Sequence, residues 1–107
     1  MNLQPNESEA LRRLKTILQN QENFVELRIF GSKAKNLSTA DSDIDVMIIV
    51  RKYSPDLQSL IDDTIFDLNI QYDCLISAII FSQEELDNGP MSESPLYKTA
   101  LQEGIQL

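Results

Sequence analysis

The chain has 107 residues, 42% of them hydrophobic, which predicts one modest core and excludes a disordered chain. It carries 17 acidic and 9 basic residues, a net charge of -8. Because an acidic surface repels phosphate backbones, direct nucleic-acid binding is disfavoured. We expect instead a basic protein partner, or a small anionic ligand whose charge is offset by metal ions.

Cys74 is the single cysteine, which excludes an internal disulfide and suits a reducing compartment. No apolar run approaches membrane length, and no basic segment followed by an apolar one resembles a secretory leader. We therefore expect a cytoplasmic protein with no membrane partner. Histidine is absent, which removes the commonest general base, so any chemistry must use carboxylates, hydroxyls, amines or bound metal.

The first predicted elements are a helix and a strand. Asn6 is a candidate cap for a helix that runs to about Asn20, because leucines recur on one stripe, at Leu11, Leu14 and Leu18. Residues 24–30 then alternate between apolar and polar side chains, which predicts a strand with one face on a core.

Gly31 and Ser32 follow this strand directly. For residues 33–36 we predict one or two helical turns, and for residues 37–42 a loop. A second strand is predicted over residues 43–50, with its isoleucines and valines at even positions on one face and Asp43, Asp45, Met47 and Ile49 on the other.

In the second half of the chain, the sequence predicts three further helices and one more strand. Ser54 and Pro55 start a helix whose apolar stripe is Leu57, Leu60, Ile61, Ile65 and Leu68. A third strand is predicted from about Gln71 to Phe81, with Asp73 near its start. Ser82 begins a short helix that ends near Gly89, and Ser94 a last helix that Gly104 can end. Helices alternating with strands indicate an α/β or α+β fold: a small mixed sheet of at least three strands, flanked by helices.

Asp43 and Asp45 are candidate metal ligands. Period-two geometry places both carboxylates on one face of a strand, and like charges that close repel unless a cation lies between them. Oxygen ligands select a hard cation, and magnesium favours a few carboxylates together with water and substrate phosphates. The alternative for two aspartates at the start of a strand is a pair of solvated charges.

Gly31 and Ser32 are candidate phosphate ligands. Glycine lets the backbone approach a ligand closely, and free N–H groups at the start of a helix bind phosphate oxygens. The Ser32 hydroxyl adds a donor, and Lys33 and Lys35 can offset the charge of a triphosphate. For each lysine, a solvated surface charge is an equal alternative.

This stretch, Gly-Ser followed after ten residues by Asp-Ile-Asp, resembles the signature of the DNA polymerase beta-like nucleotidyltransferase superfamily. The ten-residue gap and the size are similar to its smallest branch, the minimal nucleotidyltransferases of prokaryotes. That family carries a third carboxylate on a later strand, and Asp73, in Tyr-Asp-Cys-Leu-Ile, occupies the corresponding place. The ending from Ser94 to Ile105 is also similar to the family's last helix.

The resemblance implies a single nucleotidyltransferase domain over residues 1–107 that transfers AMP from ATP with two magnesium ions. Its implied catalytic residues and metal ligands are Asp43, Asp45 and Asp73, and its implied triphosphate ligands are Gly31, Ser32, Lys33 and Lys35. Members of the branch pair with a HEPN-domain RNase toxin and neutralise it by AMPylating a tyrosine. The resemblance thus implies an antitoxin, with a HEPN-type toxin as partner and acceptor.

The chain departs from the family at two positions, because Lys35 and Asn36 stand where members often have arginine and glycine. Lysine loses the bidentate phosphate binding of arginine, whereas Asn36 tolerates a left-handed backbone. Two alternatives stay open: a catalytically silent antitoxin that acts by docking, and a small-molecule nucleotidyltransferase of the aminoglycoside type. The lack of an acceptor-binding domain in the chain favours a protein acceptor.

Overall fold

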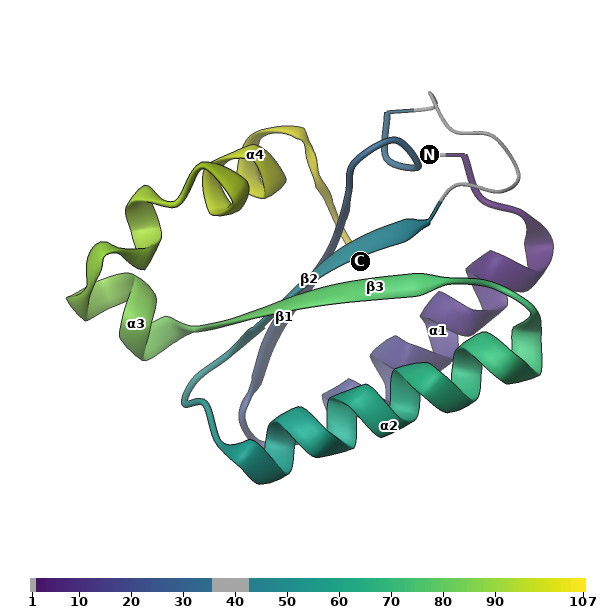
Figure 1. Cartoon of the computed structure of the whole chain (residues 1–107), viewed down its shortest axis with the longest axis horizontal. Coiled ribbons are helices and arrows are strands. Elements are labelled where there is room, and N and C mark those ends of the chain that lie inside the picture. Colours follow the sequence, from purple (N-terminus) through teal and green to yellow (C-terminus); the bar gives the residue numbers. More distant parts are fainter. Residues whose placement is uncertain (1, 36–42) are drawn as a thin grey trace.

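The computed structural model describes residues 2–35 and 43–107, and a four-stranded sheet forms its centre (Figure 1). The strand order is β3-β2-β1-β4. The strands are β1 (Phe24–Phe30), β2 (Ile44–Val50), β3 (Ile76–Ser82) and β4 (Ile105–Gln106). β1 runs antiparallel to β2 and β4, whereas β2 and β3 are parallel. This confirms the small mixed sheet, and β4 is a strand that the sequence did not predict.

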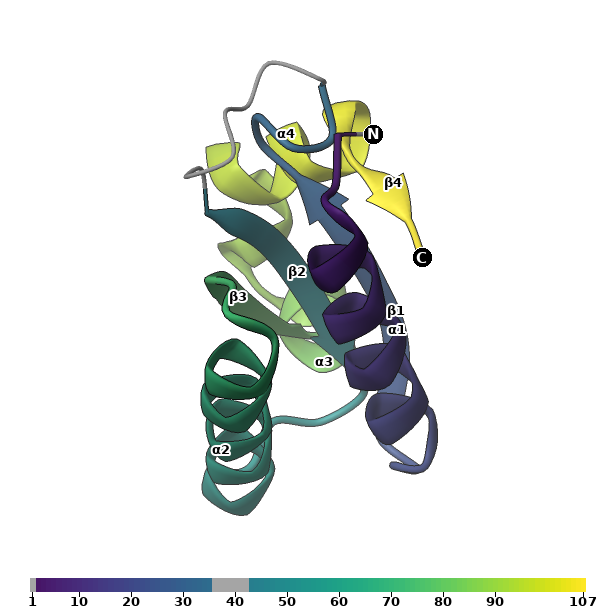
Figure 2. The ribbon, with the colours of Figure 1, turned by 90° about the vertical axis from the view of Figure 1, so that its right-hand side faces the viewer.

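Helices cover both faces of the sheet (Figure 2). One face packs against α1 (Pro5–Gln19) and α2 (Pro55–Tyr72). The other packs against α3 (Gln83–Asn88), the 3-10 helix η1 (Pro90–Glu93) and α4 (Pro95–Glu103). In the described part of the chain no helix is long and apolar enough to span a membrane.

The central strand β2 contributes to both cores. Its even positions are buried against α1 and α2: Ile44, Val46, Ile48 and Val50. Met47 and Ile49 are buried on the opposite face, under α3 and α4. The predicted alternation is confirmed, and it places Asp45 on the α3–α4 face.

The predicted starts of three helices are also confirmed. The Ser54 hydroxyl accepts from Leu57 N–H at 3.1 Å, and the Ser82 hydroxyl accepts from Glu85 N–H at 3.0 Å. Ser94 caps α4 in the same manner, and that helix ends before Gly104 as expected. Side-chain oxygens thus satisfy backbone donors that the helices cannot.

The prediction for the start of α1 was wrong, and the turn after β1 is at the lower bound of the one or two helical turns predicted. Gln4, not Asn6, precedes α1, and it forms a capping box with Glu7. The described residues after Gly31 form a single turn, in which Lys35 N–H donates to the carbonyl of Gly31 at 3.3 Å, and no helix. The predicted loop over 37–42 lies outside the described residues, as does Asn36.

Two predictions about α2 were also wrong. Leu60, expected on the buried stripe, is 37% exposed because it lies at the margin of the face that packs on the sheet. The helix continues through Tyr72, so β3 begins at Ile76 and not near Gln71. Tyr72 packs against the α1–α2 core, and this contact favours one more helical turn over extended chain.

Candidate active site

Gly31 follows β1 directly and lies against the carboxylate of Asp45. The antiparallel register pairs Phe30 with Asp45, so the next residue passes the start of β2. Gly31 has a φ of 75°, in the left-handed region, and a Cβ built on it would lie 2.6 Å from Oδ2 of Asp45. Any side chain at position 31 would therefore collide with this carboxylate, and glycine is the residue that lets the two segments come this close.

Asp43 and Asp45 interact electrostatically. Asp43 is exposed and Asp45 is partly buried. Burial, and after it the charge of Asp43, raise the pKa of the Asp45 carboxyl above its ordinary value. A cation bound by both carboxylates would relieve the repulsion and replace the lost hydration.

Lys33 points into the protein and not toward solvent. Its side chain is 1% exposed, and Nζ donates to Oε1 of Glu7, itself 5% exposed, at 3.1 Å. Glu7 also accepts from the Gln4 N–H at 2.8 Å, and the Lys33 carbonyl accepts from Asn2 N–H at 2.8 Å. The predicted phosphate ligand Lys33 thus ties the turn after Gly31 to the start of α1.

Lys35 makes an ion pair at the surface. Its Nζ lies 2.6 Å from Oε2 of Glu103 at the end of α4, and the two side chains are 40% and 41% exposed. At such exposure the pair is weak and salt-sensitive, so an arriving phosphate can displace the glutamate. The ammonium group of Lys35 is therefore able to exchange Glu103 for a phosphate.

Asp73 lies at the C-terminal cap of α2, not on a strand. Its φ is 50°, a left-handed conformation that aspartate tolerates better than most residues, which is a structural reason for this residue type. Its carbonyl accepts from the side-chain amide of Asn6 at 3.3 Å. Among the described residues, no three acidic, histidine or cysteine side chains are grouped to hold a metal ion. The structure brings Asp43 and Asp45 together and does not group Asp73 with them as a third metal ligand.

Ser77 is the residue that β3 places beside Asp45, because the parallel register pairs the two positions. It is exposed, and paired residues of neighbouring strands share a face, so its hydroxyl lies on the side of the aspartates. Sequence reasoning missed Ser77 because it started the strand too early. The signal was available: with Ile76 and Ile80 on the buried α1–α2 face, alternation directs Ser77 to the other.

A surface cleft of about 460 Å³ lies at the opposite end of the sheet from Gly31. It is lined by residues 20–23 at the start of β1 and by Ser54, Asp56, Leu57 and Leu60 of α2. Two of its side chains, Glu22 and Asp56, are acidic and none is basic. The cleft contains neither the turn after Gly31 nor Asp43 and Asp45, so it is separate from the candidate nucleotide site.

Residues 12–89 match the protein family described as "Polymerase beta, Nucleotidyltransferase". The match spans most of the chain and includes Gly31, Ser32, Asp43 and Asp45. The chain belongs to the polymerase beta nucleotidyltransferase family. Among curated protein sequences none matches it.

Solved structures of similar fold include toxin–antitoxin proteins. A chain of a toxin–antitoxin crystallised with AMP-PNP superimposes with a TM-score of 0.63 at 15% identity, over 92% of this chain and 69% of that one. A chain of a MntA–HpeT toxin–antitoxin variant gives 0.62 at 13% identity, over 91% and 70%. A structure described as a minimal nucleotidyltransferase gives 0.62 at 20% identity, over 100% and 97%. These likenesses establish the nucleotidyltransferase fold.

The residues around Asp45 fit a divalent metal ion and a nucleoside triphosphate, which this family typically uses. Two carboxylates supply the hard oxygen ligands that magnesium takes, and the cation in turn favours phosphate oxygens as its remaining ligands. Because Gly31 has no side chain, its backbone passes close to the Asp45 carboxylate, so a phosphate bound by this turn would lie near the metal ion. Ser32, partly buried in the same turn, adds a hydroxyl.

Proposed function

We propose that the protein is a magnesium-dependent nucleotidyltransferase that moves AMP from ATP to a hydroxyl of a partner protein. The observation that carries the proposal is the approach of Gly31 to Asp45, with the charge of Asp43 acting on the same carboxyl. Family membership supports the reaction class. The AMP-PNP present in a toxin–antitoxin of similar fold supports an adenine nucleotide as donor.

In this proposal Asp43 and Asp45 hold two magnesium ions, which supply charge stabilisation for the entering and leaving oxygens. The backbone of Gly31 and the hydroxyl of Ser32 bind the β and γ phosphates. Lys35 exchanges Glu103 for a phosphate oxygen, because its ion pair lies at the surface. Lys33 acts indirectly, by holding the turn in place.

The proposed role of Asp73 is that of a general base, which takes the proton from the attacking hydroxyl. Asp73→Asn tests this role, because asparagine keeps the left-handed cap of α2 while it removes the charge. We expect unchanged thermal stability and a loss of transfer activity of about a hundredfold, typical of a general base. Full activity of the folded variant would remove Asp73 from the site and leave its backbone conformation as the reason for the residue.

The proposed partner is a HEPN-type toxin that is neutralised when one of its tyrosines receives AMP. Two observations support a toxin partner: neighbours of this fold are components of toxin–antitoxin complexes, and the net charge of -8 suits a basic protein. The same charge disfavours an RNA or DNA acceptor. The cytoplasm, where toxin and ATP meet, is the corresponding location.

The experiment is transfer of label from α-labelled ATP, with magnesium, to a co-expressed HEPN-domain protein. We expect label on the partner with the wild-type chain and none with the Asp43→Asn, Asp45→Asn double variant. Replacement of both charges removes the metal ligands and leaves the strand intact. Absence of label with the wild-type chain, in a complex that still forms, would contradict an enzymatic function.

That second outcome would favour a catalytically silent antitoxin that neutralises its partner by docking alone. One observation supports this alternative: Asp73 is not grouped with Asp43 and Asp45. Neutralisation of the toxin by the double variant separates the alternatives, because a docking protein would keep this activity and an enzyme would lose it.

A further inference from the structure

The outer face of α2 is apolar and acidic, and nothing in the described structure covers it (Figure 2). We define this face by Asp62, Asp63, Phe66, Asp67 and Ile70, all of which are exposed. Phe66 is 65% and Ile70 68% exposed, and they lie four residues apart, so they form one patch on the helix surface. An aromatic and a branched aliphatic side chain left this open indicate an interaction site.

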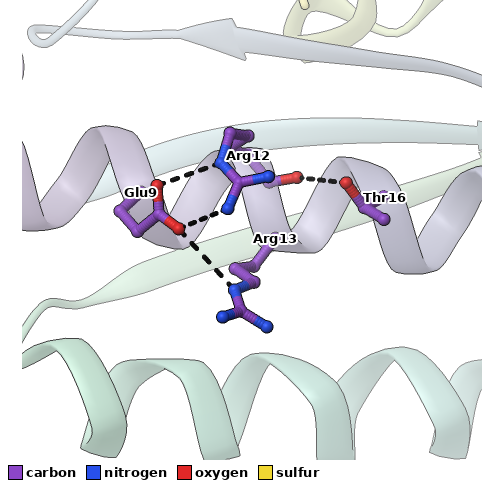
Figure 3. A network of polar contacts seen from close by, with 4 residues as sticks. All are labelled: Glu9, Arg12, Arg13 and Thr16. Carbon is purple, nitrogen blue, oxygen red and sulfur yellow. Dashed lines mark hydrogen bonds and ion pairs between the residues drawn. The ribbon is translucent and has the colours of Figure 1, made fainter.

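The aspartates of this face are not neutralised within the protein. The ion pairs of the described residues use glutamates: Glu7, Glu9, Glu26, Glu93 and Glu103. Figure 3 shows one such case on α1, where Arg12 and Arg13 both bind Glu9. By contrast α2 contains four aspartates and no lysine or arginine, and none of its acids has an ion pair among the described residues.

We propose that the outer face of α2 is the docking surface for a basic protein partner, which on the proposed function is the HEPN-type toxin. Phe66 and Ile70 would enter an apolar recess of that partner, while lysines or arginines at its rim meet Asp63 and Asp67. A buried apolar centre with charged residues around it is the usual anatomy of a protein interface. Because the exposed charges of this face are acidic, a partner with basic residues at its rim is the expected occupant.

Other occupants fit the charge of this face poorly. A second copy of the chain would bring two sets of unpaired aspartates together, and like charges across an interface are costly. Nucleic acid and anionic lipid carry the same sign as the aspartates and are repelled. A protein with a basic rim is the occupant that satisfies both the apolar and the acidic side chains.

The docking surface and the candidate active site lie on different faces of the sheet. Asp45 lies on the face of α3 and α4, whereas α2 covers the opposite face. A partner bound at α2 therefore does not cover the aspartates or the turn after Gly31, and its acceptor hydroxyl would have to reach them past the edge of the sheet. Docking and transfer should respond to different substitutions.

The test measures the affinity of the purified chain for the co-expressed HEPN-domain protein by isothermal titration calorimetry. One variant removes the apolar pair, Phe66→Ala with Ile70→Ala, and its control removes exposed leucines of α4, Leu96→Ala with Leu101→Ala. A second variant removes charge, Asp63→Asn with Asp67→Asn, and its control makes the same change on α3, Glu84→Gln with Asp87→Asn.

We expect each outer-face variant to weaken binding about tenfold or more, and the controls to bind as the wild type does. The charge variant should also flatten the dependence of affinity on salt concentration. Binding of magnesium and ATP should be unchanged in the two outer-face variants, since α2 covers the face of the sheet opposite Asp45. Thermal denaturation confirms that each variant is folded.

Three outcomes would overturn the proposal. If outer-face variants bind the HEPN-domain protein as tightly as the wild type does, the docking surface lies elsewhere and the proposed function stands. If the wild-type chain has no affinity for that protein, the partner named in the proposed function is wrong, and the docking proposal falls with it. If the chain alone is a dimer that Phe66→Ala with Ile70→Ala dissociates, the face is an interface between copies.

Discussion

A side chain at position 31 would occupy space that the carboxylate of Asp45 already fills. A Cβ on Gly31 would lie 2.6 Å from Oδ2 of Asp45, closer than any two such atoms pack. The residue at the end of β1 and the residue at the start of β2 are therefore a matched pair. Glycine is the residue that allows this close approach of the turn to the carboxylate.

Gly31→Ala should cost both stability and ligand binding. A left-handed φ of 75° is strained for alanine by about 1–2 kcal/mol, and the new methyl displaces the Asp45 carboxylate. We expect a lower urea midpoint and a loss of magnesium-dependent ATP binding, both measured on the same preparation. Gly89→Ala, at a φ of -137°, is the control and should leave ATP binding unchanged. Wild-type ATP affinity in Gly31→Ala would separate this position from the site.

The stability of the metal-free protein should fall as pH rises through the titration of Asp45. Burial and the charge of Asp43 raise the pKa of this carboxyl in the folded state, so folding favours its protonated form. The contribution of this protonated carboxyl to the free energy of unfolding is fully present below the ordinary carboxyl pKa of about 4. It is lost as pH rises through the raised pKa that Asp45 has in the folded protein. Asp45→Asn should therefore be the more stable protein at pH 7, with a difference that shrinks at low pH.

Thermal denaturation across this pH range, with and without magnesium, measures the effect. Magnesium should raise the melting temperature of the wild type at pH 7 and leave Asp45→Asn unchanged, because the cation removes the penalty that the substitution also removes. A wild-type melting temperature that is insensitive to magnesium would argue that Asp43 and Asp45 are not metal ligands.

Glu103→Gln should raise the affinity for ATP. In the protein without bound nucleotide, Glu103 forms an ion pair with Lys35, and a phosphate must displace Glu103 from this lysine. An exposed ion pair of this kind contributes roughly 0.5–1 kcal/mol, so its removal should raise the affinity for ATP about two- to fivefold. This gain should vanish at high salt, which screens the pair. Glu93→Gln breaks the Lys98 pair on the same side of the molecule and is the control. Equal affinities for the two variants would exclude Lys35 as a phosphate ligand.

Glu7→Gln should destabilise the protein strongly, because it leaves Lys33 buried without its carboxylate. Removal of one partner of a buried ion pair costs about 3–5 kcal/mol, whereas Glu9→Gln, in the exposed network of Figure 3, should change little. Replacement of both partners by methionine should recover much of the loss. Urea denaturation gives the three values, and a mild effect of Glu7→Gln would mean that other groups also compensate the charge of Lys33.

Local patterns in the sequence predicted most of the elements and which residues form half of the candidate site. Alternation along residues 43–50 was sufficient to assign the two faces of β2, because side chains of a strand point alternately to opposite sides. The hydroxyls of Ser54, Ser82 and Ser94 marked helix starts, since a cap is a contact between near neighbours in the chain. The same locality places Asp43 beside Asp45, and Gly31 directly after a strand.

Contacts between distant segments were beyond the sequence, and they decided the rest. The burial of Lys33 depends on Glu7, which lies 26 residues away, and the surface position of Lys35 depends on Glu103. The end of α2 at Tyr72 depends on packing against the α1–α2 core, and this moved Asp73 from a strand to a helix cap and brought Ser77 beside Asp45. Residue type and spacing thus determined which side chains are available for chemistry, whereas tertiary packing determined which of them meet.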